Sequence, residues 1–152
     1  MREFEINLFT KALSCAQEER FIEAIEGFRE LIDTCPESDL ADDACYNIGL
    51  SYILMNQPIK ALKFFQKVLD EYPDGTISVL GAEDEYGLTA SKTRYAMMNC
   101  LCSLNKVPNA KEIYAELKKD QDSYIIKFEK KITFASLGHN LLFRIENESV
   151  IK

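Results

Sequence analysis

The sequence is poor in the groups that most enzymes use for catalysis. It contains one histidine, His139, and it has no GxSxG, HExxH or glycine-rich phosphate-binding motif. Its paired carboxylates, such as Asp42 with Asp43, lie at the expected start of a helix, where acids interact favourably with the helix dipole. We therefore expect a protein that is not an enzyme and that uses no cofactor.

The cysteines lack the regular spacing of a disulfide framework or a metal site. They are Cys15, Cys35, Cys45, Cys100 and Cys102, and most of them lie in segments with apolar periodicity. Only Cys100 and Cys102 are close in sequence, and at that spacing a helix points the two sulfurs about 200° apart. We expect reduced, buried thiols and no bound metal.

The features of membrane-spanning, exported and nucleic-acid-binding proteins are also missing. The apolar runs, such as residues 52–55, are far shorter than the roughly 20 residues that cross a bilayer. The first residues lack the basic, apolar and small-residue regions of a signal peptide. With 18 basic and 25 acidic residues the net charge is −7, which opposes binding to phosphates. We expect a cytoplasmic protein with no membrane span and no nucleic-acid partner.

The charge is divided unevenly along the chain. Residues 1–90 hold 7 basic and 18 acidic side chains, a net charge of −11, whereas residues 91–152 hold 11 and 7, a net charge of +4. Most charged side chains of a helical protein only keep the exposed faces of its helices hydrated. An acidic first part and a basic second part also favour contact between copies of the chain.

What the sequence does contain is an internal repeat. Segment 21–38 aligns with segment 59–75 at a constant offset of 37 residues, which superposes Ala24 on Ala61, Phe28 on Phe65, Leu31 on Val68 and Pro36 on Pro73. A weaker third copy, 109–123, places Ala110, Tyr114 and Leu117 at the same spacing, with Asp122 in place of the proline. Gly49 lies in the helix before the second copy, where a glycine lowers helix stability relative to alanine. This loss is explained if the missing side chain lets the following helix approach closely.

This pattern resembles the tetratricopeptide repeat, in which Leu-Gly, Tyr, Ala-x-x-x-Phe and a closing Pro recur on two antiparallel helices. In this sequence it is carried by Cys45, Ile48, Gly49, Tyr52, Ala61, Phe65 and Pro73. The longer period, with the linker in residues 35–49, is similar to the subtype of the Tol–Pal coordinator and of the lipoprotein of the outer-membrane β-barrel assembly machine. The resemblance implies an all-α solenoid that binds other proteins.

We predict three helix pairs in residues 1–122, at about 3–37, 40–74 and 89–122, and a C-terminal capping element in residues 123–152. The helices are expected at about 3–18, 21–34, 40–55, 58–71, 89–104 and 107–120. An inserted loop, 74–88, is expected to be a flexible connection, with a ligand site as the alternative. The tail favours a capping helix with Ile125, Phe128, Ile132, Ala135 and Leu142 on one stripe. The alternative is a β-hairpin with a turn at residues 138–140.

The first helix of each pair lines the concave wall of such a solenoid, so the side chains beside its packing stripe are candidate partner-binding residues. They are Phe9, Leu13, Ala16, Tyr46, Asn47, Leu50, Ile53, Leu54, Lys92, Tyr95, Asn99 and Cys102. They predict an apolar groove for a peptide or helix of a partner protein, although Leu50 and Leu54 alternatively only pack against neighbouring helices. We predict a scaffold or adaptor in a larger assembly. The alternative is a dedicated chaperone similar to the class II chaperones of type III secretion.

The tail holds more apolar residues than one cap requires. Phe134, Leu137, Leu141 and Phe143 lie off its main stripe, and an exposed strip of this kind would promote aggregation. We therefore predict a second contact surface there, used either for the partner or, most simply, in a homodimer.

Overall fold

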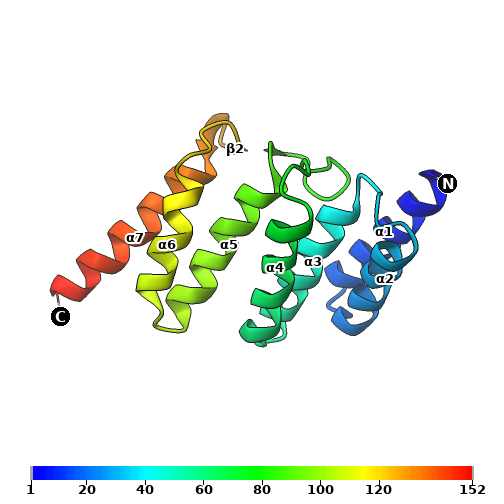
Figure 1. The fold of residues 1–152 in the computed structure, drawn as a ribbon, viewed down its shortest axis with the longest axis horizontal. Coiled ribbons are helices and arrows are strands. Elements are labelled where there is room, and N and C mark those ends of the chain that lie inside the picture. The colour runs from blue at the N-terminus through cyan, green and yellow to red at the C-terminus, as the bar shows by residue number, and fades with distance from the viewer. Residues whose placement is uncertain (1, 152) are drawn as a thin grey trace.

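The computed structural model describes residues 2–151, with the side chains of residues 2–148. In this range α1 (Arg2–Gln17) is followed by α2 (Phe21–Thr34), α3 (Ala41–Leu54) by α4 (Pro58–Glu71), α5 (Thr89–Ser103) by α6 (Val107–Leu117), and α7 (Phe134–Ile151) comes last. The helix pairs stand side by side in a row, with the two termini at opposite ends (Figure 1). The prediction of a helical solenoid of three pairs with a C-terminal capping helix is confirmed.

The residues that define the sequence repeat form the interior of the helix pairs. Ala24, Phe28 and Leu31 are fully buried in the first pair, and their counterparts Ala61, Phe65 and Val68 are fully buried in the second pair. In the third pair, Ala110 and Leu117 are equally buried. The periodicity in the sequence is therefore the periodicity of the core.

The first helix of each pair ends in the same way. Glu19, Asn56 and Asn105, which follow α1, α3 and α5, have left-handed φ angles of 63°, 58° and 59°. In each case the next backbone N–H donates back into the last turn, at 2.8 Å, to the carbonyls of Cys15, Tyr52 and Leu101. This is the Schellman arrangement, which satisfies carbonyls that a helix end leaves unpaired. The second helix therefore starts in the same direction in every pair.

The inserted loop between α4 and α5 is part of a small sheet. Its strand β1 (Glu85–Tyr86) pairs antiparallel with β2 (Tyr124–Lys127), which pairs antiparallel with β3 (Lys130–Thr133). The backbone N–H of Leu88 also donates to Ser123 Oγ at 2.8 Å. The expectation of a flexible connection is corrected, because these bonds fix the loop against the segment after α6.

The tail combines the two alternatives that the sequence left open. It forms a hairpin first, turning at Phe128 and Glu129 and not at residues 138–140, and α7 begins only at Phe134. An isolated hairpin is marginal in water, but here β1 adds a third strand from a distant part of the sequence. Ile125 and Ile132 are therefore cross-strand partners and do not share a helical stripe.

Helix α7 occupies the position of the first helix of a further pair. It contacts α5 and α6, just as α5 contacts α3 and α4. At Gly138 it packs closely on both α5 and α6, since an added methyl group would lie 3.0 Å from Leu117 Cδ2 of α6 and 3.1 Å from Met98 Sδ of α5. The row thus ends on a helix that covers the last pair. No helix in residues 2–151 is long and apolar enough to cross a membrane.

Candidate functional site

A groove between α3 and α5 brings together half of the residues predicted to bind a partner. It has a volume of about 310 Å³, and Tyr46, Leu50 and Ile53 of α3 line one side of it. The opposite side is formed by α5 and includes Lys92, Tyr95 and Asn99. These two helices are the first helices of neighbouring pairs, as the prediction required.

The remaining walls of the groove come from parts of the chain that the sequence did not connect with it. Glu85 of β1, Ile125 of β2, and Phe134 and Leu137 of α7 all line it. Neither Glu85 nor Ile125 belongs to the repeat, so no periodic signal identified them. The groove and the inserted loop are therefore one structural unit.

One ion pair lies among these mainly apolar walls. Lys92 pairs with Glu85, and its ammonium group also lies 4.4 Å from the centroid of the Tyr46 ring. Burial raises the pKa of the Tyr46 hydroxyl, and the negative charge of Glu85 raises it further. The groove therefore offers a mainly apolar surface with one ion pair in its wall, between Glu85 of β1 and Lys92 of α5.

The other predicted groove residues lie elsewhere. Phe9 is fully buried, with its ring edge-on to Phe28 at 5.5 Å, so its assignment to the groove is corrected. Leu13 and Ala16 of the same helix are half-buried against the core of the first two pairs, and Cys102 is half-buried against the core of the third pair. Asn47 donates a hydrogen bond to the carbonyl of Asp43 at 2.8 Å, and Leu54 is 59% exposed at the end of α3, outside the groove. Leu50 was predicted either to bind a partner or only to pack against neighbouring helices. It does pack against the core, and it also lines the groove.

The predicted second contact surface does not form an exposed strip. Phe134 and Leu141 are only 3% and 8% exposed, and Leu137 lines the groove. Phe143 alone of the four is largely exposed, at 59%. The reason is that α7 packs against α5 and α6 together, so a wider face of the helix is buried than a cap on one helix requires.

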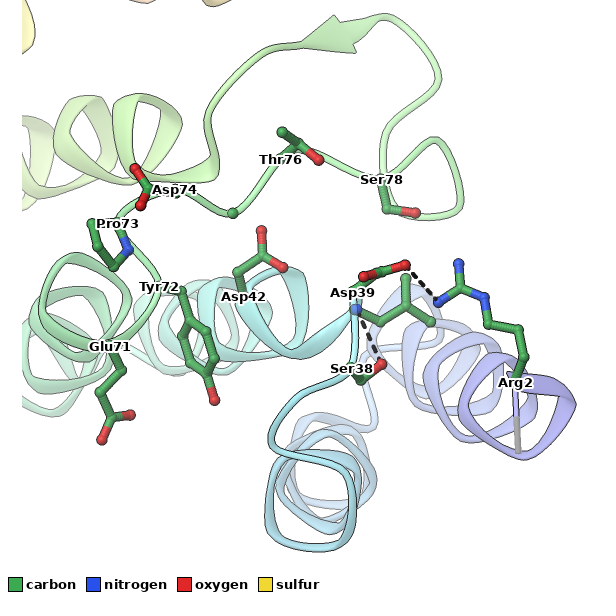
Figure 2. A pocket seen from close by; sticks show the side chains of 12 residues that line it. Arg2, Ser38, Asp39, Asp42, Glu71, Tyr72, Pro73, Asp74, Thr76 and Ser78 are labelled. Carbon is green, nitrogen blue, oxygen red and sulfur yellow. Dashed lines mark hydrogen bonds and ion pairs between the residues drawn. The ribbon is translucent and has the colours of Figure 1, made fainter.

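A second hollow, which we call the acidic cleft, opens where α2 and α4 end and α3 begins (Figure 2). Its volume is about 630 Å³, and its lining residues are Arg2, Ser38, Asp39, Leu40, Asp42, Glu71, Tyr72, Pro73, Asp74, Gly75, Thr76 and Ser78. Arg2 forms an ion pair with Asp39 at 3.6 Å. Four carboxylates and one arginine thus line the cleft.

Two adjacent carboxylates of α3 hold the start of α5 and the inserted loop. Thr89 Oγ1 donates to Asp42 Oδ2 at 2.6 Å, and the backbone N–H of Ser78 donates to Asp43 Oδ1 at 3.0 Å. Burial raises the pKa of Asp42. Burial and then the charge of Asp42 raise the pKa of Asp43 to about 7. The expectation that these acids only solvate the start of a helix is corrected, because both side chains are buried beneath the loop.

Among the described side chains, no group of three or more histidine, cysteine, aspartate or glutamate residues is placed to hold a metal ion. The five cysteines are free thiols, three of them buried.

Residues 42–74 match the family model of the tetratricopeptide repeat. This segment is similar to a tetratricopeptide repeat. The match covers α3 and α4, the pair in which Gly49 packs against Phe65, and the family model is that of the general repeat rather than of the Tol–Pal type. A search of the curated proteins finds no match to the chain. Tetratricopeptide repeats form helical solenoids whose concave surfaces typically bind other proteins.

Proposed function

We propose that this chain is a non-enzymatic protein-interaction module that binds a peptide segment of a partner in the groove between α3 and α5. The observation that carries this proposal is the convergence of Leu50, Ile53 and Tyr95 with Ile125 and Leu137 around one apolar hollow. Large apolar side chains that stay accessible at a concave surface favour a binding role over a purely structural one.

The size of the groove favours a short segment of the partner. Its volume of about 310 Å³ is near the lower end of the roughly 300–1,000 Å³ of small-molecule pockets. That space suits one or two apolar side chains, which is how peptide anchors commonly fill an interface. We infer a partner segment with a large apolar anchor and a polar group beside the Lys92–Glu85 pair. Such recognition suits an adaptor that holds a defined segment in a larger assembly.

Two neighbouring residues of α3 provide a matched test. Ile53 lines the groove and is half-buried, whereas Leu54 lies outside it and is 59% exposed. Peptides are selected on the wild-type chain from a displayed library and then measured against Ile53→Asp and Leu54→Asp. Both variants place an acid in the last turn of the same helix, so the cost through the helix dipole is similar. Because Ile53 also packs against the core, circular dichroism must show that Ile53→Asp is folded before its binding is compared.

We expect Ile53→Asp to weaken binding of the selected peptides by about tenfold or more, because a buried anchor contact contributes at least roughly 1.4 kcal/mol. Leu54→Asp should leave binding within about twofold. The selected peptides should share a large apolar residue. Equal affinity of both variants, or selected peptides without an apolar residue in common, would show that the groove is not the binding site.

A further inference from the structure

The loops that carry the unusual surface features all lie along one edge of the solenoid. Helices α2, α4 and α6 end at this edge and α3, α5 and α7 begin there, so we call it the loop edge (Figure 1). The acidic cleft lies toward the α1 end of the loop edge, the inserted loop follows, and the β2–β3 hairpin lies toward the α7 end. These features therefore face the same side of the molecule.

The turn of the hairpin exposes an aromatic ring in a strained backbone. Phe128 is 86% exposed, the highest value among the exposed large apolar side chains of the described residues. Phe128 and Glu129 have φ angles of 52° and 63°, in the left-handed region. Tight hairpin turns of this type normally use Asn and Gly, and a bulky residue at positive φ is an outlier. An exposed phenylalanine in this strained position points to a role for its ring outside the fold.

The residues around this ring carry positive charge that the described side chains do not neutralise. None of Lys127, Lys130 and Lys131 forms an ion pair with a described carboxylate. Lys127 and Lys131 instead lie over the rings of Phe128 and Tyr124, at 5.8 and 4.2 Å from the centroids. We call residues 127–131 the basic finger.

The acidic cleft carries the opposite charge. Asp39, Asp42, Glu71 and Asp74 line it, and among the described side chains Arg2 pairs with Asp39 and Lys67 with Glu71, so the acids still outnumber these cations by two. Leu40, Tyr72 and Pro73 supply apolar surface inside the same hollow. An aromatic ring flanked by lysines is complementary to this cleft in charge and in chemistry. The cleft has a volume of about 630 Å³, which has room for the ring and the lysines beside it.

We propose that the basic finger of one copy binds in the acidic cleft of a second copy, and that the second copy returns the same contact. A two-fold axis through the inserted loop would exchange the two ends of the loop edge, so each finger would meet the other copy's cleft. The inserted loops would meet at the axis, which covers Val79, Leu80 and Tyr86, now 64%, 36% and 41% exposed. This contact is separate from the groove between α3 and α5.

Two other uses of the finger fit the observations less well. Pairing of the free edge of β3 with another strand is opposed by Lys130 and Lys131, because lysines on an edge strand discourage such pairing. Docking on an anionic membrane is opposed by the net charge of −7 and by Glu129 at the turn itself. A second copy supplies both the negative charge and the apolar contact.

The test is the mass of the full chain in solution, measured by sedimentation over a concentration series in the micromolar range. We expect reversible formation of a species with twice the mass of the chain, weakened by salt because the contact is partly ionic. Phe128→Asn removes the ring and places a residue that tolerates the left-handed turn, so the fold is kept while the dimer constant weakens by about tenfold or more. Phe143→Asn, at an exposed site of α7 away from the finger, is the matched control and should change nothing.

A charge exchange then identifies the cleft as the receiving surface. One variant carries Lys130→Glu and Lys131→Glu, and the other carries Asp39→Lys and Asp74→Lys. Each variant alone presents like charges at both contacts and should be monomeric, whereas an equal mixture presents opposite charges at both and should form the dimer again. A wild-type chain that stays monomeric, a dimer unaffected by Phe128→Asn, or a mixture that remains monomeric would each overturn the proposal.

Discussion

The close contact between Gly49 and Phe65 predicts how Gly49→Ala changes the free energy of unfolding. Whether the change is a loss or a gain depends on the side chain at position 65. A methyl group added at Gly49 would lie 2.6 Å from Cδ1 and 3.0 Å from Cζ of the Phe65 ring, both closer than normal carbon contacts. The ring is fully buried and lies 5.7 Å from the Tyr46 ring, centroid to centroid, so it has little room to move. Gly49→Ala should therefore overpack the second helix pair.

Two effects of opposite sign set the magnitude. Alanine in place of glycine inside a helix stabilises by about 1 kcal/mol through backbone entropy. Overpacking of a filled core costs about 1 to 3 kcal/mol. We expect a net loss of about 1 kcal/mol in the free energy of unfolding, and a larger loss for Gly49→Leu. The measurement is urea unfolding followed by circular dichroism, in which the midpoint falls while the slope stays constant.

A second background separates overpacking from any general effect of the substitution. Phe65→Leu alone should destabilise by creating space, but in its presence the methyl group at position 49 no longer meets a ring. Gly49→Ala should then stabilise by up to about 1 kcal/mol, the helix-propensity gain. If Gly49→Ala stabilises the wild-type chain, or destabilises both backgrounds equally, the packing account of the helix pair is wrong.

Two further predictions concern the inserted loop. The folded pKa of Asp43 is raised to about 7 from an ordinary value of 3.8, so between these values the folded state binds a proton that the unfolded chain does not, and this contribution to stability is lost as the pH rises toward 7. In urea unfolding at pH 5 to 8, the stability of Asp43→Asn relative to wild type should therefore increase with pH, and a constant difference would contradict the assignment. Gly87 has a φ of 104°, and a methyl group there would lie 2.6 Å from Ser123 Cα, so Gly87→Ala should loosen β1 from β2 at a cost of about 1 to 3 kcal/mol. Faster hydrogen exchange of the Ile126 amide, which donates to the Asp84 carbonyl at 2.8 Å, would report this, and unchanged exchange would refute it.

The helical part of the fold was predictable because each repeat position has a local physical cause. Ala61 and Phe65 recur 37 residues after Ala24 and Phe28, and all four are buried in equivalent places. Pro58 and Pro108 mark the first turns of α4 and α6, as their missing N–H groups allow. The predicted ends of the first six helices lie within three residues of the observed ones.

The sheet and the far walls of the groove were not predictable in the same way, because they depend on contacts between distant segments. The two residues of β1 carry no strand signal, and their pairing with β2 joins positions about 40 apart in sequence. Burial of Asp42 and Asp43 likewise depends on where the inserted loop lies. Sequence periodicity located the α3 and α5 sides of the groove, and tertiary pairing supplied the other sides.

Binding of a partner segment in the groove between α3 and α5 can be mapped residue by residue from amide chemical shifts. The labelled chain is titrated with a peptide selected from the displayed library. We expect the largest changes around Leu50, Ile53 and Tyr95, extending to Ile125 and Leu137, which line the same groove. Changes confined to α2, α4 and α6, with the groove residues unaffected, would contradict binding in the groove.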